Sequence, residues 1–252
     1  MSGLIALLTD FGYSDGFVGC MKGVILSINP DAKIVDISHD VEPFNITHGA
    51  LLLRAHFSYF PENTIFLCVV DPGVGSSRLP VAVRAGNYTF VGPYNGLFDL
   101  AIKSIGDKPK AYKIEKYTLP RVSSTFHGRD VFAPVSAYLS KGVKLEELGS
   151  QIEYQFTLHW EEPRKEQSWL VGKVVYFDRY GNCITNLPCG NYSRGTFRNR
   201  ELKIVSYFLQ GSEQEPALIC GSFGLMELFL PKYNARERLR VSLGEEVRVE
   251  QT

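Results

Sequence analysis

The sequence lacks an excess of charge of either sign. Its 252 residues contain 27 Lys and Arg against 27 Asp and Glu, which gives a formal net charge of zero at pH 7. No run of basic residues stands out, so nothing favours electrostatic capture of nucleic acid or of an anionic membrane. We expect neither as a partner.

Long apolar runs and paired cysteine motifs are also missing. No stretch approaches the roughly 20 apolar residues of a membrane span, and the N-terminal LIALL is too short for the core of a signal peptide. The cysteine count is odd and no C-x-x-C spacing occurs, which favours free thiols over disulfides or a zinc site. These absences predict a cytoplasmic globular protein. The cysteines are Cys20, Cys68, Cys183, Cys189 and Cys220.

The segment TIFLCVVDPGVGSSR, residues 64–78, combines a buried strand with a polar turn. Its first seven residues are apolar and rich in β-branched types, which is typical of a strand covered on both faces. Asp71 follows, where open α/β sheets place their ligands, although an aspartate that only caps a turn also explains the motif. Arg78 ends the loop. Because the next residues predict a strand and not a helix, this is not a phosphate-binding loop.

Strand and helix patterns alternate over the first 150 residues. Strands are expected at 4–8, 33–37, 81–85, 88–91 and 112–116, and helices at 16–29, after Pro43, at 96–104 and up to about 141. We expect Ser14 and Asp15 to cap the first helix. This alternation predicts an α/β domain with a Rossmann-like sheet over residues 1–155.

The composition changes after residue 155. Residues 156–168 are charged, contain a proline and lack an apolar period, which indicates a linker. From 169 to 252 the chain consists of short strand-like runs separated by Gly, Asn and Pro. A small antiparallel β-barrel domain is the economical interpretation.

Several polar landmarks have an ordinary structural explanation when taken singly. Asp10 follows the first strand, where it can cap a helix, and His127 stands beside Gly128 at a helix entrance. The segments FDRYGN (177–182) and GSFG (221–224) are typical of turns between strands. Their combination is more informative than any one of them.

Many long segments in order resemble the family of S-adenosyl-L-methionine hydroxide adenosyltransferases, which is related to fluorinating and chlorinating enzymes. The segments that carry the resemblance are TDFG, ISHDVEPFNI, FPENTIFLCVVDPGVGSSR, VGPYNGLF, STFHGRDVFAP, VVYFDRYGNCITN, GSFGLMEL and Asn234-Ala235. It implies hydrolysis of S-adenosyl-L-methionine to adenosine and L-methionine, without a cofactor or a metal. It also implies a homotrimer whose sites lie between neighbouring subunits.

The resemblance further implies a role for each matching residue. Asp71, Arg78 and His127 would be the catalytic groups that handle water. The first domain would bind the ribose through Asp10 and enclose it with Phe44, Phe126 and Gly128. The second would bind adenine through Tyr180, Asn182 and Ala235. It would bind the methionine ammonium through Asp178 and the methionine carboxylate through Ser222.

The implied reaction is a displacement at the ribose C5′ by water or hydroxide. Arg78 and a protonated His127 could stabilise hydroxide, while Asp71 would orient the pair or accept the proton; the sequence leaves those roles open.

Two other functions remain as alternatives. A sensor that binds S-adenosylmethionine or adenosine without turnover would need Asp10, Asp178 and Asn182, but it has no use for the catalytic trio. A halide-dependent adenosyltransferase is disfavoured, because the halide-using relatives carry a tyrosine in place of Asp71 and lack His127. The sequence departs from the fluorinating relatives at Phe223, where they have a basic residue. How the methionine carboxylate is held is therefore not fully explained.

Overall fold

The computed structural model describes residues 3–252, and the chain passes from one compact unit to a second between His159 and Trp160. The first unit is a seven-stranded sheet in the order β2-β1-β3-β5-β4-β6-β7, in which β2, β1, β3 and β5 run parallel. The remaining pairings are antiparallel, beginning with the hairpin of β4 and β5. Its strands are β1 (Leu4–Thr9), β2 (Lys33–Ser38), β3 (Ile65–Val69), β4 (Pro80–Ala85), β5 (Tyr88–Pro93), β6 (Lys110–Lys113) and β7 (Gln151–Ile152).

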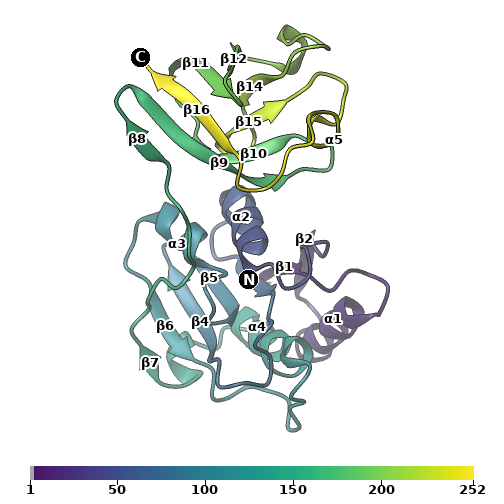
Figure 1. The fold of residues 1–252 in the computed structure, drawn as a ribbon. Helices are drawn as coiled ribbons and strands as arrows, with labels where there is room; N and C mark the ends of the chain where they lie inside the picture. The colour runs from purple at the N-terminus through teal and green to yellow at the C-terminus, as the bar shows by residue number, and fades with distance from the viewer. Residues whose placement is uncertain (1–2) are drawn as a thin grey trace. The chain divides into compact units, whose positions relative to one another are not determined.

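Helices cover both faces of this sheet (Figure 1). One face carries α1 and α4, which contact each other, and the other carries α2 and α3. A π-helical turn, η2, leads directly into α4. The helices are α1 (Phe17–Ile28), α2 (Ile46–His56), α3 (Asp99–Ile105) and α4 (Ala133–Ser140), and the short turns are η1 (Phe57–Tyr59), η2 (Gly128–Phe132) and η3 (Leu145–Glu147).

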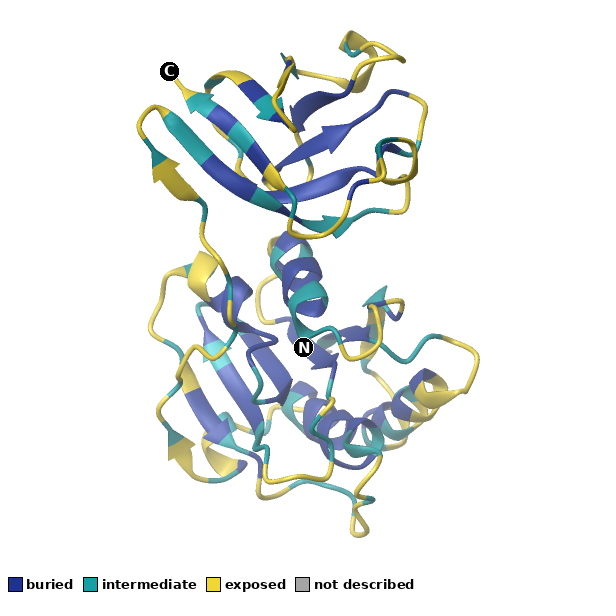
Figure 2. Cartoon of the chain, viewed as in Figure 1, coloured by how far each residue is buried: buried dark blue, intermediate teal, exposed yellow. Residues whose placement is uncertain are grey.

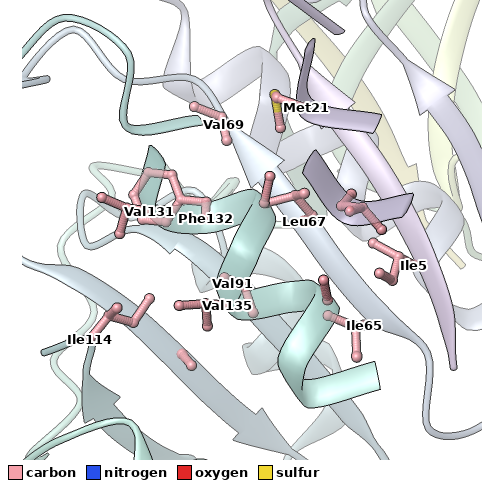
Figure 3. Close-up of a cluster of buried hydrophobic side chains, with 14 of the residues drawn as sticks. Ile5, Met21, Ile65, Leu67, Val69, Val91, Ile114, Val131, Phe132 and Val135 are labelled. Carbon is pink, nitrogen blue, oxygen red and sulfur yellow. The ribbon is translucent and has the colours of Figure 1, made fainter. Parts of the chain in front are cut away.

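The core of the first unit lies between the parallel strands and the helices α1 and α4. Figure 3 shows its buried side chains, among them Leu67 of β3, Met21 of α1 and Val135 of α4. All five residues of β3 are buried, as the apolar run of the sequence predicts for a strand covered on both faces. Figure 2 shows the same inner strands as a continuous buried layer.

The cap expected for α1 is wrong. The residue that precedes the helix is Gly16, which has a φ of 72° and makes no side-chain cap. Glycine reaches this left-handed conformation without strain, whereas Ser14 and Asp15 lie too far upstream to receive the first free N–H groups.

The second unit is one nearly closed, barrel-like sheet in the order β12-β11-β16-β9-β10-β15-β14-β13, which confirms the expected fold class. The strand β8 pairs with β9 and falls inside the segment expected to be a linker. Short helices follow β13 and precede β16. The elements are β8 (Arg164–Glu166), β9 (Trp169–Phe177), β10 (Cys183–Pro188), β11 (Tyr192–Phe197), β12 (Arg200–Leu202), β13 (Ile204–Val205), η4 (Phe208–Gln210), β14 (Ala217–Cys220), β15 (Leu225–Phe229), α5 (Ala235–Leu239) and β16 (Glu246–Gln251).

The expectation that all cysteines are free thiols is wrong for two of them. Cys189 and Cys220 form a disulfide, with their Cα atoms 5.2 Å apart. They follow β10 and end β14, two strands that flank β15, so the barrel brings together residues that are 31 positions apart in the sequence. The other three cysteines, Cys20, Cys68 and Cys183, are free thiols as expected.

No helix among residues 3–252 is long and apolar enough to cross a membrane.

Candidate active site

Two carboxylates lie together at the carboxyl edge of the first sheet. Asp10 follows β1 and Asp71 follows β3, and these parallel strands are paired up to Thr9 and Val69. The negative charge of Asp71 acts on Asp10, although burial is the main reason that the pKa of Asp10 is raised. The expected ligand-binding edge of an open α/β sheet is therefore where both side chains lie.

The structure brings Asp71, Arg78 and His127 together. Arg78 donates from Nε to Oδ1 of Asp71 over 3.1 Å and from Nη2 to Oδ2 of the same carboxylate. The same Nη2 lies 3.3 Å from Nδ1 of His127. Because a guanidinium has no acceptor, Nδ1 of His127 must accept this contact.

A tight loop places Arg78 against the segment that carries His127. Gly75 has a φ of 76°, and a Cβ atom there would lie 2.2 Å from the carbonyl oxygen of Ser124. Only glycine allows the two backbones to approach this closely. The small residues between Asp71 and Arg78 therefore position the arginine as well as forming a turn.

One nitrogen of Arg78 is left without a partner. Its Nη1 is buried and has no hydrogen bond among residues 3–252, while Nε and Nη2 are occupied. The side chains of Arg78 and Asp71 are only 9% and 4% exposed, and the guanidinium carbon lies 5.4 Å from the centre of the Phe132 ring. A buried donor without a partner is costly, so this nitrogen suits a ligand oxygen.

The expectation that His127 is protonated does not fit this geometry. A proton on Nδ1 would point at the Arg78 cation. Burial is the larger cause that lowers the pKa of His127, and the charge of Arg78 lowers it further. The ring is therefore neutral near pH 7, with its proton on Nε2, and it serves as a hydrogen-bond donor instead of as a cation.

Aromatic rings enclose the space beside these polar groups. A cavity of about 100 Å³ is lined by Asp71, His127 and Gly128 together with the edge-to-face rings of Phe11, Phe17 and Phe126. Two of the sequence-expected residues, Phe126 and Gly128, therefore lie beside the trio. Such apolar walls exclude water and strengthen the electrostatic effect of the charged groups.

Phe44, like Asp10 and Arg78, does not line this cavity. Its side chain is 72% exposed. Its backbone has a φ of 66°, and its N–H donates to Oδ2 of Asp10 over 2.9 Å. In this unit Phe44 contacts the site through the main chain.

The second unit has its own cavity of about 600 Å³. It is lined by four residues that the sequence singled out, together with an acidic residue that it did not. Tyr180 is 77% exposed at this cavity, whereas Asn182 is buried. The residues from the sequence are Asp178, Tyr180, Asn182 and Ser222, and the additional acid is Glu227.

Asp178 holds the turn between β9 and β10. Its carboxylate accepts the backbone N–H groups of Tyr180 and Asn182 over 2.9 and 2.8 Å, and the side-chain amide of Asn182 over 2.8 Å. The turn lies against the start of α5, where Arg236 donates its N–H to the carbonyl of Gly181 over 3.0 Å. This contact ties the turn to the residue that follows the buried Ala235, which is not among the residues that line the cavity.

Ser222 and Phe223 lie in the turn between β14 and β15, directly after Cys220 of the disulfide. The ring of Phe223 stacks on Tyr176, with 5.9 Å between the ring centres and 12° between their planes. Both Ser222 and Phe223 line the cavity, so the apolar ring of Phe223 forms part of its wall.

Two models of one protein family match most of the chain. A model described as the SAM hydroxide adenosyltransferase N-terminal domain matches residues 5–149, and one described as the corresponding C-terminal domain matches residues 172–248. The chain belongs to the SAM hydroxide adenosyltransferase family.

Curated proteins and a solved structure resemble the chain over most of its length. An (R)-S-adenosyl-L-methionine hydrolase of Methanocaldococcus jannaschii is 36% identical, covering 98% of this chain and 95% of the relative. One from Thermus thermophilus is also 36% identical, covering 97% and 98%. A fluorinase of Actinopolyspora mzabensis is 28% identical over 80% of this chain and 77% of its own. The crystal structure of an uncharacterised conserved protein from Thermotoga maritima superposes with a TM-score of 0.89 at 33% identity, covering 98% of this chain and all of that one.

Glu227 is the site residue that sequence reasoning missed in this family member. It is the only charged residue in the run LMELF, and an acid inside an apolar strand was the signal that could have found it. Its carboxylate lines the second cavity, and burial raises its pKa to about 7, with Asp178 adding to the effect.

Proposed function

We propose that this chain hydrolyses S-adenosyl-L-methionine to adenosine and L-methionine. The observation that carries the proposal is the Asp71–Arg78–His127 constellation, with one buried arginine nitrogen left for a ligand oxygen. Membership of the family and the names of the hydrolase relatives at 36% identity support the same reaction.

The reaction needs no acid for its leaving group. An oxygen of water attacks the ribose C5′, the C5′–S bond breaks, and its electron pair turns the sulfonium into the neutral thioether of methionine. The oxygen loses one proton and becomes the 5′-hydroxyl of adenosine. The protein therefore has to aim and activate the water, which has a pKa of about 15.7 in bulk.

The trio suits this task. Nη1 of Arg78 and the Nε2–H of neutral His127 donate to the attacking oxygen, which stabilises the negative charge that develops on it. Asp71 fixes the guanidinium through two hydrogen bonds and, as a residue that lines the cavity, receives the proton. Alignment of the oxygen, C5′ and sulfur contributes further, since good orientation is worth up to about 7–11 kcal/mol.

The substrate contacts divide between the two units. Asp10 binds the two ribose hydroxyls, with Phe126, Gly128 and Phe44 around the sugar. Tyr180, Asn182 and Ala235 bind adenine. Ser222 binds the methionine carboxylate, and Asp178 lies at the same cavity.

The configuration at sulfur is part of this proposal. The hydrolase relatives are named for the (R)-epimer of the sulfonium. A site that holds both the ribose and the amino-acid chain fixes the direction of the third substituent, the methyl group. We expect the (R)-epimer to be hydrolysed faster than the (S)-epimer when each is supplied separately and adenosine is measured by chromatography.

An isotope experiment tests the reaction. The protein is incubated with S-adenosylmethionine in ¹⁸O-labelled water with a chelator present, and the label should appear in the 5′-oxygen of adenosine. Unlabelled adenosine, or activity that the chelator abolishes and an added metal restores, contradicts the proposal. A sensor would bind the substrate and release no adenosine. A halide-dependent enzyme would require chloride or fluoride for turnover.

We also propose that the protein is a homotrimer in which each site combines the first unit of one subunit with the second unit of a neighbour. Head-to-tail contacts that close into a ring produce three such sites. To test this, Asp71→Ala and Asp178→Ala chains are denatured, mixed in equal amounts and refolded. About a quarter of shared sites then contain two intact halves. If mixed trimers are confirmed by mass and no activity returns, each chain builds its own site.

A further inference from the structure

Glu227 occupies the cavity face of a strand whose other face is in the barrel core. Met226 and Leu228 belong to the core of the second unit, and alternate residues of a strand point to opposite faces. Glu227 therefore points away from that core, as do Phe229 and the paired residue Ile219, which line the cavity with it.

The carboxylate of Glu227 is buried and has no partner. The residue is 5% exposed, and within residues 3–252 its side chain makes no hydrogen bond or ion pair. Room for it comes from Gly221, where a Cβ atom would lie 1.7 Å from Oε1 of Glu227. The raised pKa of about 7 has burial as its first cause and the charge of Asp178 as its second. A carboxylate buried without a partner is costly unless a ligand supplies one.

Asp178 differs from Glu227 in being already occupied. Three donors of its own turn fill most of the acceptor capacity of its carboxylate. The one cationic side chain at the cavity, Lys232, is paired with Glu213. The acid that is free to receive a cation is thus Glu227.

We propose that Glu227 binds the α-ammonium group of the methionine part of the substrate, while Asp178 holds the turn beside it. This inference rests on the proposed function, because it takes its ligand from that reaction. The substrate carries two cations, and only the ammonium has N–H donors, three of them, that can satisfy a carboxylate. A charge-assisted hydrogen bond of this kind also neutralises the buried acid.

Two non-reactive ligands test the assignment by calorimetry. One is S-adenosyl-L-homocysteine, which has the ammonium but no sulfonium, and the other is its analogue without the amino group. We expect the wild type to bind the amino compound about 10-fold or more tightly than the analogue. Glu227→Gln should reduce this preference to about 2-fold or less and leave adenosine affinity unchanged. Glu201→Gln changes an exposed acid of β12 that does not line the cavity, so it is the matched control and should keep the full preference.

The pH dependence of binding shows whether Glu227 contacts the ammonium or the carboxylate of the substrate. The preference of the wild type for the amino compound should grow by about 10-fold from pH 6 to pH 8 as Glu227 ionises, and should stay flat in Glu227→Gln. The other titratable side chains that line the cavity are Asp178, Tyr180, Lys232 and Tyr233, and all four are kept in Glu227→Gln. If Glu227 were protonated and donated to the substrate carboxylate, affinity for both compounds would fall with rising pH, and the proposal would be wrong.

Other results of these experiments also test the assignment of Glu227 to the ammonium. Equal losses for adenosine and for the amino compound in Glu227→Gln, or a wild type that does not prefer the amino compound, overturn the assignment. Thermal melts of both variants show whether they fold. Adenosine release from S-adenosylmethionine is measured separately. If the wild type prefers the amino compound but releases no adenosine, the proposed reaction is wrong and the assignment of Glu227 to the ammonium is unaffected.

Discussion

The two units differ in how completely their polar groups are paired before any ligand arrives. In the first, Asp71, Arg78 and His127 already bind one another beside a cavity of about 100 Å³, and one arginine nitrogen is left over. In the second, a cavity of about 600 Å³ contains a buried acid with no partner among residues 3–252. The first arrangement is preorganised for chemistry, whereas the second depends on its ligand for completion. Variants in each unit should therefore fail differently.

The largest effect is expected from breaking the trio. Asp71→Ala, Arg78→Ala and His127→Ala should each lower turnover by about 10²–10⁴-fold, because each removes a group that activates or aims the water. Affinity for S-adenosyl-L-homocysteine should change little. Calorimetry and single-turnover kinetics separate the two quantities.

A matched control is Arg121→Ala, which removes an exposed arginine of the same unit and should leave turnover unchanged. If Asp71→Ala instead loses affinity as severely as Asp10→Ala does, Asp71 belongs to the binding groups.

The disulfide should matter for the stability of the second unit alone. Closing a loop of about 31 residues stabilises a fold by roughly 3.5 kcal/mol in the chain-entropy model. Cys189→Ser with Cys220→Ser should therefore lower the unfolding temperature of this unit by several degrees. Cys20→Ser is the matched change at an exposed free thiol. Calorimetric melts that do not differ between the two variants would contradict this expectation.

Glu227 should make the second unit less stable as the pH rises. Its pKa is raised from 4.5 to about 7, so its contribution is fully present below pH 4.5 and is lost as the pH rises through 7. Relative to the wild type, Glu227→Gln should gain up to about 3 kcal/mol at pH 8 and nothing at pH 4. Urea melts at the two pH values measure the difference. A gain of the same size at both values would mean that ionisation is not the cause.

The smallest effect is expected in the dependence of kcat/KM on pH below neutrality. Because burial and Arg78 lower the pKa of His127, kcat/KM should stay flat as the pH falls past about 6.5, the ordinary pKa of histidine. It should decline only at lower pH, by up to 10-fold per unit, as the ring becomes a cation. His127→Gln should lose this decline. A decline centred near 6.5 would mean that the surroundings leave the ring unshifted.

The sequence predicts the first unit better than the second for physical reasons. Asp10 and Asp71 were found because each follows a buried strand, and parallel strands bring such ends to one edge. Glu227 was missed because it lies inside a strand, where its direction depends on the closure of the barrel. The pairing of Cys189 with Cys220 likewise depends on strands that are distant in sequence. The state of His127 depends on an arginine 49 residues away, which local patterns do not reveal.

The disulfide has a consequence for how the second unit withstands proteases. It closes a covalent ring from Cys189 to Cys220 that contains β11, β12, β13 and the exposed residues 206–210. A single cut within this ring leaves both pieces of the chain joined through sulfur. Barrel strands from both sides of the cut, including β10 and β15, therefore stay in one molecule, and the fragments separate on a denaturing gel only after reduction.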